Sequence, residues 1–395
     1  MKFKISILPL VLLLAAGCSS APAPETPPAA AADPSGPVLD TMDYKVRVVT
    51  IADGLAYPYS MAFLPDGGLL VTEMPGRVRI IRDDKLAPEP VAVIDGVFHD
   101  GGSKGLMDIA LHPKFAENKL VYVTYNKSGE NGSTVVLARG TFDGTRLNDV
   151  KEVFVSDAWL KTMGRQNSRI AFARDGTLYM TVSVGGGGPQ TKRAQDMNDL
   201  AGKILRLRDD GTVPPDNPFV GRAGHRPEIF SYGHQNVHAL VTHPETGEIW
   251  GIEHGDEANI LKPGGNYGWP YVSVGGSGGA SGTPEPAFPL PPGLTLVAPR
   301  VEWKTPDIHP TGMAFYTADR FPKWKGSIFV GGLSTEQLHR TALTADGTGA
   351  RENLFSKIGH WLCDVRQGPD GLIYFTTYDD PDAAGTVRRV EPVEP

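Results

Sequence analysis

The sequence predicts an all-β fold, a single six-bladed β-propeller, and three observations support this prediction. The chain of 395 residues contains 47 glycines and 34 prolines, both above average usage and unsuited to helix interiors. A turn signal followed by a short strand recurs about six times, roughly once per 60 residues, which is near the period of propeller repeats. Hydrophobic residues make up 40% of the chain, enough for a large core and too many for a disordered protein. A two-domain β protein is the alternative.

Six copies of the turn signal carry the repeat. Each places Pro, Asp or Gly directly before a run of β-branched, aromatic or aliphatic residues, which is the chemistry of β-hairpins. Residues 273–292 interrupt the pattern with glycine and proline runs that cannot form central strands, so we expect a loop at the rim of a site there. The six copies are Leu64–Thr72, His112–Tyr125, Ala173–Thr181, His243–Gly251, Phe321–Val330 and Gly368–Phe375.

The first 18 residues have the pattern of a bacterial export signal. Two lysines precede an apolar run from Ile5 to Ala16, which is too short to span a bilayer as a mature helix. The string Leu14–Cys18 resembles a lipobox, in which Cys18 is lipidated and becomes the new N-terminus, although Ala15 stands where leucine is usual. Ser19, rather than aspartate, follows the cysteine, and this resembles the pattern of lipoproteins sorted to the outer rather than the inner membrane. We therefore expect a lipid-anchored protein on the periplasmic side of the envelope, at the outer membrane, with an ordinary cleaved signal as the alternative.

The mature chain divides into a spacer and one domain. Residues 19–43 are rich in alanine and proline and predict an extended tether, and residues 44–395 form the propeller. Cys363 has no cysteine partner in the mature domain, so no structural disulfide is expected. The net charge of -7 argues against a nucleic-acid partner.

Several longer strings are more specific than the repeats. Together and in this order they resemble the soluble aldose sugar dehydrogenases that use pyrroloquinoline quinone (PQQ), also called the glucose/sorbosone dehydrogenase family. The resemblance covers about residues 45 to 390. The strings are Ala194–Met197, Gly202–Leu207, Pro215–Phe219, Tyr232–Asn236, Glu253–Asn259, Gly264–Pro270 and Thr311–Tyr316.

The resemblance implies a six-bladed propeller that oxidises the C1 hydroxyl of a sugar. In the family, cationic and amide side chains hold PQQ, a calcium ion polarises its quinone, and a histidine takes the hydroxyl proton. Such chemistry requires a base near the substrate, a Lewis acid on the quinone oxygen and positive charge for a polyanionic cofactor.

Most residues at these family positions differ in this chain. Arg165 stands at the position of the histidine base, and an arginine stays protonated at neutral pH. The calcium loop is shortened to Glu253–Glu257. We therefore predict that the PQQ and calcium chemistry is lost or altered. The family's cofactor positions fall on Ser103, Gln235, Asn236, Ser334, Trp361 and Cys363, and only Asn236 keeps the family residue.

Four histidines stand where the family pattern has none, and neutral imidazoles suit Zn, Cu or Fe. One hypothesis is a new metal site, with His254 or Asp256 as a further ligand, and the alternative is four independent structural or substrate-stacking histidines. These four are His99, His238, His309 and His360.

The sequence thus predicts a sugar dehydrogenase-like envelope lipoprotein. A carbohydrate-binding pseudoenzyme and an enzyme with a histidine-lined metal site are the alternatives. The expected partners are a sugar or another small molecule and the lipid anchor, and nothing in the sequence identifies an electron acceptor. The residues suited to a sugar-binding groove are Arg165, Tyr267, Trp269 and Trp361, although core packing is the alternative for the aromatic ones.

Overall fold

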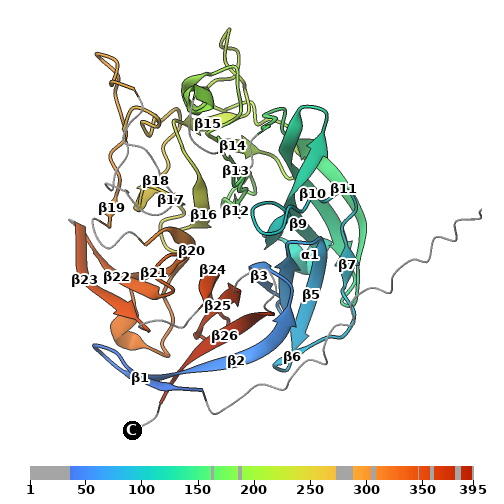
Figure 1. The fold of residues 1–395 in the computed structure, drawn as a ribbon, viewed down its shortest axis with the longest axis vertical. Coiled ribbons are helices and arrows are strands. Elements are labelled where there is room, and N and C mark those ends of the chain that lie inside the picture. Colours follow the sequence, from blue (N-terminus) through green and yellow to red (C-terminus); the bar gives the residue numbers. More distant parts are fainter. Residues whose placement is uncertain are drawn as a thin grey trace, which may run out of the picture.

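Antiparallel sheets surround a central axis as the blades of a propeller (Figure 1). The computed structural model describes residues 36–161, 164–185, 189–272, 288–303, 308–345, 347–355, 360–378 and 384–393, which form six sheets. The predicted six-bladed propeller is confirmed. Cys18, the tether up to residue 35 and residues 273–287 of the predicted rim loop lie outside the described residues. No helix in the described ranges is long and apolar enough to cross a bilayer.

The first three blades follow the chain in order from the axis outward. Blade 1 contains β3 (Pro58–Phe63), β4 (Leu69–Glu73), β5 (Arg77–Arg82) and β6 (Lys85–Leu86), with β7 (Ala92–Val93) also paired to β5. Blade 2 contains β8 (Leu106–Leu111), β9 (Leu120–Gly129), β10 (Gly132–Phe142) and β11 (Leu147–Val155), with α1 (Phe115–Asn118) between β8 and β9. Blade 3 contains β12 (Ile170–Phe172), β13 (Leu178–Val182), β14 (Lys203–Leu207) and β15 (Ile229–Tyr232), with the 3₁₀ helix η1 (Pro189–Gln195) before β14.

The last three blades include the closure of the ring. Blade 4 contains β16 (Val237–Thr242), β17 (Ile249–Glu253), β18 (Glu257–Ile260) and β19 (Val301–Glu302). Blade 5 contains β20 (Pro310–Phe315), β21 (Ser327–Gly332), β22 (Leu338–Thr344) and β23 (Gly347–Leu354), with η2 (Pro322–Trp324) before β21. Blade 6 contains β24 (Trp361–Gln367), β25 (Ile373–Tyr378) and β26 (Gly385–Pro392), followed by β2 (Lys45–Leu55) and β1 (Val38–Asp40) from the other end of the chain.

Blade 6 joins the two ends of the propeller domain. The early strand β2 pairs antiparallel with the late strand β26, from Val46 opposite Pro392 to Leu55 opposite Gly385. The inner strands β3, β8, β12, β16, β20 and β24 contact one another in a ring around the axis. Because closure depends on a strand near the N-terminus, blade 6 forms only when residues more than 300 apart in sequence meet.

The predicted turns have a shared local structure. In the copies at Asp66, Asp175 and Asp370, the carboxylate accepts a hydrogen bond from the backbone N–H two residues later, at 3.0, 2.9 and 3.1 Å. The glycine that follows each aspartate has a φ between 78° and 87°, the left-handed region that glycine adopts without steric cost. This repeated turn explains why the blades could be counted from the sequence.

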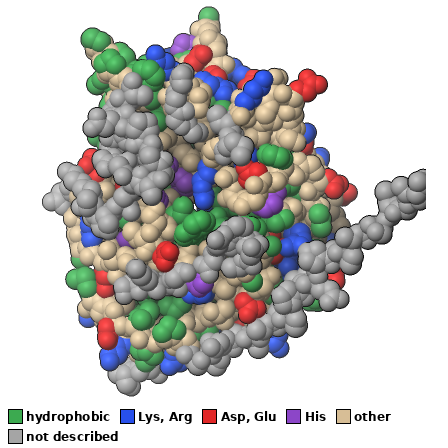
Figure 2. Space-filling model, in the orientation of Figure 1, with side chains coloured by type: hydrophobic (Ala, Val, Ile, Leu, Met, Phe, Trp, Pro, Cys, Tyr) green, Lys and Arg blue, Asp and Glu red, His purple; other side chains and the backbone are tan. Residues whose placement is uncertain are grey.

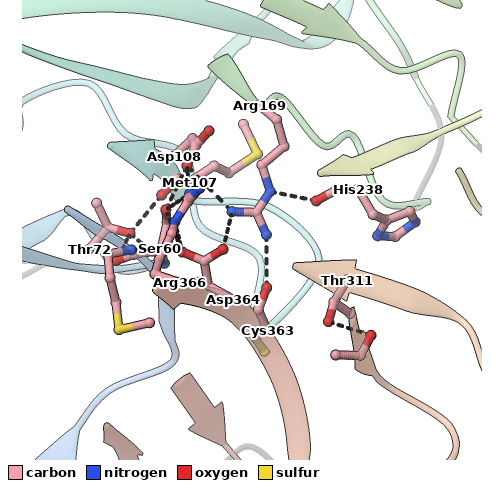
Figure 3. A network of polar contacts seen from close by, with 12 residues as sticks. Ser60, Thr72, Met107, Asp108, Arg169, His238, Thr311, Cys363, Asp364 and Arg366 are labelled. Carbon is pink, nitrogen blue, oxygen red and sulfur yellow. Dashed lines mark hydrogen bonds and ion pairs between the residues drawn. The ribbon is translucent and has the colours of Figure 1, made fainter. Parts of the chain in front are cut away.

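A buried ion network occupies the axis and connects the inner strands (Figure 3). The guanidinium of Arg169 lies 3.4 Å from a carboxylate oxygen of Asp108 and 3.6 Å from one of Asp364. It also donates to the backbone carbonyls of His238 at 2.7 Å and Cys363 at 2.8 Å. The hydroxyl of Ser60 donates to Asp108 at 2.6 Å. The network therefore connects four other inner strands to the segment just before β12, namely β3, β8, β16 and β24.

The sixth inner strand joins the same arrangement through a hydroxyl group. Thr311 of β20 donates to the Leu362 carbonyl of β24 at 2.7 Å. Backbone N–H groups also donate to the two carboxylates: Ile170 donates to Asp108 at 2.8 Å, and Met61 donates to Asp364 at 3.0 Å. Few polar atoms of this network are left unpaired, which is the condition for burying charge in a stable core.

We predict that Arg169→Met lowers the free energy of unfolding by about 3–5 kcal/mol, because it removes one partner of a buried ion network. Arg208→Met changes an exposed arginine and should stay within about 0.5 kcal/mol of the unchanged protein. Urea denaturation followed by tryptophan fluorescence measures both values. Equal effects of the two substitutions would show that the axial network does not stabilise the fold.

Candidate functional site at one end of the propeller axis

The residues predicted from the sequence to form a site lie where the inner strands begin. Figure 2 shows histidine and basic side chains near the centre of the face that it displays. Ser334 follows β21 in the turn toward β22. Segments from five blades therefore supply the predicted residues at one end of the axis. Of these residues, Ser103 precedes β8, Arg165 precedes β12, Gln235 and Asn236 precede β16, His309 precedes β20, and His360 precedes Trp361 at the start of β24.

Three histidines from two neighbouring blades form an imidazole row, defined as His238, His254 and His309. The ring centroids of His238 and His254 lie 5.9 Å apart, and those of His254 and His309 lie 5.0 Å apart. The amide of Asn167 is 3.0 Å from Nδ1 of His238, and the hydroxyl of Ser334 is hydrogen-bonded to Nδ1 of His309. The structure thus brings His238, His309 and Ser334 together.

Asp256 fixes the backbone that carries His309. Its two carboxylate oxygens accept hydrogen bonds from the N–H groups of Ile308 at 3.0 Å and His309 at 3.1 Å. Both Asp256 and His309 have left-handed backbones, with φ of 56° and 42°. Non-glycine residues adopt this region at an energetic cost and persist there when surrounding contacts hold them. Asp256 is therefore a positioning residue for the imidazole row.

An aromatic row lies on blades 6, 1 and 2 and is defined as Trp361, Tyr378, Tyr57 and His99. Successive ring centroids are 5.7, 5.5 and 5.3 Å apart, each pair in an edge-to-face arrangement. His99 donates from Nδ1 to the carbonyl of Lys104 at 2.8 Å. Trp361 is 37% exposed, whereas Tyr378 is buried. The row thus ends in an indole face that a ligand can reach.

Arg165 lies between groups from several blades, with Tyr59, His238, Cys363 and Tyr378 near enough to interact electrostatically. Burial opposes its charge, but Tyr378, Tyr59 and Cys363 outweigh that effect and raise the pKa of the guanidinium. It remains partly exposed, and no described carboxylate forms an ion pair with it. Arg165 is therefore a fixed cation and cannot serve as the base at its position.

The thiol of Cys363 is buried within the same group of side chains. Burial raises its pKa to about 12, although Arg165 and Arg169 act in the opposite direction. It is a free cysteine. A neutral, enclosed thiol is a poor nucleophile and a poor metal ligand. Cys363 therefore fills a predicted cofactor position without supplying charge there.

The acidic residues at the shortened calcium loop interact with neighbouring protein groups. Glu253 accepts from His234 at 2.6 Å and from the backbone N–H of Gln235 at 3.2 Å. Burial and the nearby Glu253 raise the pKa of Glu257. Gln235, Glu253 and Glu257 line a cavity of about 20 Å³, room for about one water molecule. Asn236 has a buried side-chain oxygen without a hydrogen-bond partner among the described residues.

Two aromatic residues predicted for a sugar groove lie in the core instead. Tyr267 is buried, stacks on His234 at 4.5 Å between ring centroids, and donates its hydroxyl hydrogen to the carbonyl of Ile260. Trp269 is also buried and belongs to the hydrophobic core of blades 2 and 3. Both also line the small cavity beside Gln235, Glu253 and Glu257. Of that predicted set, Trp361 is exposed and Arg165 is partly exposed.

The four predicted metal-binding histidines do not converge. Across the part of the chain that the structure describes, no three His, Cys, Asp or Glu residues are placed to hold one metal ion. Each ring is held by a different neighbour: His99 by the carbonyl of Lys104, His238 by Asn167 and His309 by Ser334. His99 therefore joins the aromatic row, whereas His238 and His309 join the imidazole row. His360 precedes Trp361 in the chain and stands outside both rows.

Sequence reasoning missed four residues in and beside this site. Tyr57, Tyr59, Tyr378 and Asn167 have positions that resemble ordinary strand or turn residues, and the aromatic ones are also typical of a core. A usable signal was available for Asn167, because it lies two residues from both Arg165 and Arg169 in the segment that opens β12. We define the axial site as Arg165, Tyr59, Tyr378 and Cys363 with the imidazole and aromatic rows beside them.

Six four- or five-stranded antiparallel sheets around one axis define the class of protein as a six-bladed β-propeller. The family model for glucose/sorbosone dehydrogenase matches residues 55–387. This chain belongs to the glucose/sorbosone dehydrogenase family.

Individual relatives agree with this assignment. The chain is 33% identical to the aldose sugar dehydrogenase YliI of Escherichia coli, over 88% of this chain and 93% of the relative. A crystal structure of a glucose dehydrogenase superposes with a TM-score of 0.78 at 36% identity, covering 88% of this chain and 99% of the other. The PQQ-bound aldose sugar dehydrogenase of Streptomyces coelicolor gives a TM-score of 0.67 at 27% identity, covering 88% and 99%.

Burial of His238 predicts a pH dependence of stability. Burial, with His254, Arg165, Arg169 and His309 nearby, holds its pKa well below the usual value, so the folded protein keeps His238 neutral. The unfolded chain takes up a proton at this residue below about pH 6.5, so stability falls as the pH falls below that value.

The predicted slope is up to about 1.4 kcal/mol per pH unit for this group, and His238→Gln should remove that part. Urea denaturation of both proteins between pH 5 and 8 measures the difference, in which other titrating groups cancel. Parallel stability curves for the two proteins would show that His238 is protonated to the same extent in the folded and the unfolded chain.

Proposed function

We propose that this chain is a sugar-binding protein of the bacterial envelope, built on the aldose sugar dehydrogenase fold, and that it takes its sugar at the axial site. One observation carries the proposal: the exposed indole of Trp361 lies at the end of an aromatic row in the same site as the cation Arg165. Sugars bind proteins by packing their C–H face on aromatic rings and by hydrogen-bonding their hydroxyls to charged and polar groups.

The described residues do not fit the PQQ site of the family. A cofactor with several carboxylates needs several cations, and the axial site supplies Arg165, because the guanidinium of Arg169 is engaged by Asp108 and Asp364. No described group of three acidic, histidine or cysteine side chains is placed to hold a metal. We therefore assign no step to PQQ or calcium in this chain.

Sugar oxidation is the second candidate, and two observations favour it. The family includes dehydrogenases, among them the PQQ-bound Streptomyces relative. His238 lies close to Arg165 and is kept neutral by burial, so it is a group of the axial site able to accept a hydrogen bond from a hydroxyl, and its lowered pKa makes it a weaker base than an exposed histidine. A sugar hydroxyl hydrogen-bonded to His238 would place that proton acceptor where the family histidine is missing.

We expect calorimetric titration of the full chain, purified in mild detergent, to show sugar binding with a Kd of about 10 µM to 1 mM. Titration with PQQ and calcium should show no tight binding, and sugar-dependent dye reduction should be absent. Trp361→Ala should weaken sugar binding about tenfold through lost ring packing, whereas the matched Trp361→Phe should retain most of it. Tight PQQ binding with sugar-dependent dye reduction would replace this proposal with the dehydrogenase candidate.

The envelope location is a separate proposal and rests on the lipobox-like string that ends at Cys18. Cells expressing the chain should incorporate labelled palmitate into it, and the chain should sediment with outer membranes. Cys18→Ser should abolish the label and leave the chain without a lipid anchor. Secretion of an unlabelled wild-type chain would favour an ordinary cleaved signal.

A further inference from the structure

Among the described arginines at the axis, one has no carboxylate partner. Within the buried network, Arg169 and Arg366 are matched by Asp108 and Asp364: Arg366 lies 2.9 Å from Asp364 and 3.4 Å from Asp108, and Arg169 contacts both aspartates. Two guanidinium groups and two carboxylates leave no net charge there. The arginine that lies outside this balance is Arg165.

Arg165 faces groups that carry no negative charge at neutral pH. The nearest titratable ones are the phenols of Tyr378 and Tyr59 and the thiol of Cys363, and burial keeps the thiol protonated. His238 is also neutral. Among the described residues, no Asp or Glu pairs with this guanidinium. Tyr378 shares a side-chain hydrogen bond with the guanidinium, but a partly buried cation is stabilised most by a hydrogen-bonded anion.

The position of Arg165 makes that anion part of a ligand. Its side chain is partly exposed, so a ligand entering at the axial end can contact it. A guanidinium offers a planar pair of N–H donors that matches a carboxylate, whereas a neutral sugar hydroxyl uses one donor at a time. The exposed ring of Trp361 belongs to the same site through Tyr378, which contacts it at 5.7 Å between centroids.

We infer that the axial site selects a sugar acid, such as a uronate or an aldonate, whose carboxylate pairs with Arg165 while the sugar face packs on Trp361. This inference rests on the proposed sugar-binding function and names its ligand class. The imidazole row supplies groups that donate and accept, as the remaining hydroxyls require. A quinone such as PQQ also carries carboxylates that could pair with Arg165. The experiment below distinguishes a sugar acid from such a quinone.

The experiment compares matched pairs of ligands on the full chain in detergent by calorimetry. Glucuronate is compared with glucose, and galacturonate with galactose, because each pair differs at C6 alone. We expect the acid of at least one pair to bind about tenfold or more tightly at low salt, as a charge-assisted contact does, and to lose part of that preference at high salt.

Variants at Arg165 assign the preference to this residue. Arg165→Gln should abolish the preference, so that the acid and its neutral sugar bind with similar affinity, and Arg165→Lys should retain part of the preference. Arg208→Gln, at an exposed arginine, is the matched control and should change neither affinity. Melting temperatures of all variants verify that a lost preference does not reflect unfolding.

The outcomes separate this inference from the function on which it rests. If neutral and acidic sugars bind equally, or if Arg165→Gln keeps the preference, the sugar-acid assignment is wrong and sugar binding stands. If no sugar of either kind binds, the proposed function and this inference both fail. If PQQ binds more tightly than any sugar acid and depends on Arg165, the carboxylate belongs to a quinone and the sugar-acid assignment is overturned.

Discussion

The buried pairing of Arg169 with Asp108 and Asp364 is the interaction on which the rest of the structure depends. It joins residues from the segments of blades 2, 3 and 6, and backbone carbonyls and hydroxyls extend it to the other inner strands. Burying this charge is favourable only because nearly every donor and acceptor is paired. The network therefore sets the positions of the inner strands, and through them the residues at the ends of those strands.

The axial site follows from this geometry. The segments that open the inner strands meet at one end of the axis, so chemically different side chains from distant parts of the sequence become neighbours. Asp256 shows the same principle at shorter range, because its carboxylate from blade 4 holds the backbone of His309 in blade 5. A propeller can thus assemble an imidazole row and an aromatic row without a local sequence motif for either.

The sequence predicts features that form within a few neighbouring residues. It does not predict contacts between residues that are far apart in the chain. Asp-Gly turns such as Asp66-Gly67 form within a few residues, so the blades could be counted correctly. The pairing of Arg169 with Asp364 joins residues almost 200 apart, and no periodicity predicts it. For the same reason His99 and His238 could be assigned to different blades at one end of the axis, yet the neighbours that each ring contacts became evident only in three dimensions.

The scaffold and the ligand-facing residues are interleaved on the same strands, and this arrangement explains how the site could change while the fold persisted. Asp364 points into the buried network, and the neighbouring Cys363 side chain lies with Arg165 and Tyr378. Cys363 lies at an irregularity in the pairing of β24 with β25, between Leu362 and Asp364, and its side chain and that of Asp364 meet different neighbours. Arg169 holds Asp108 and Asp364, whereas Arg165, four residues earlier, has no described carboxylate partner. The first arginine serves the fold, and the second is the one that the sugar-acid proposal assigns to a ligand.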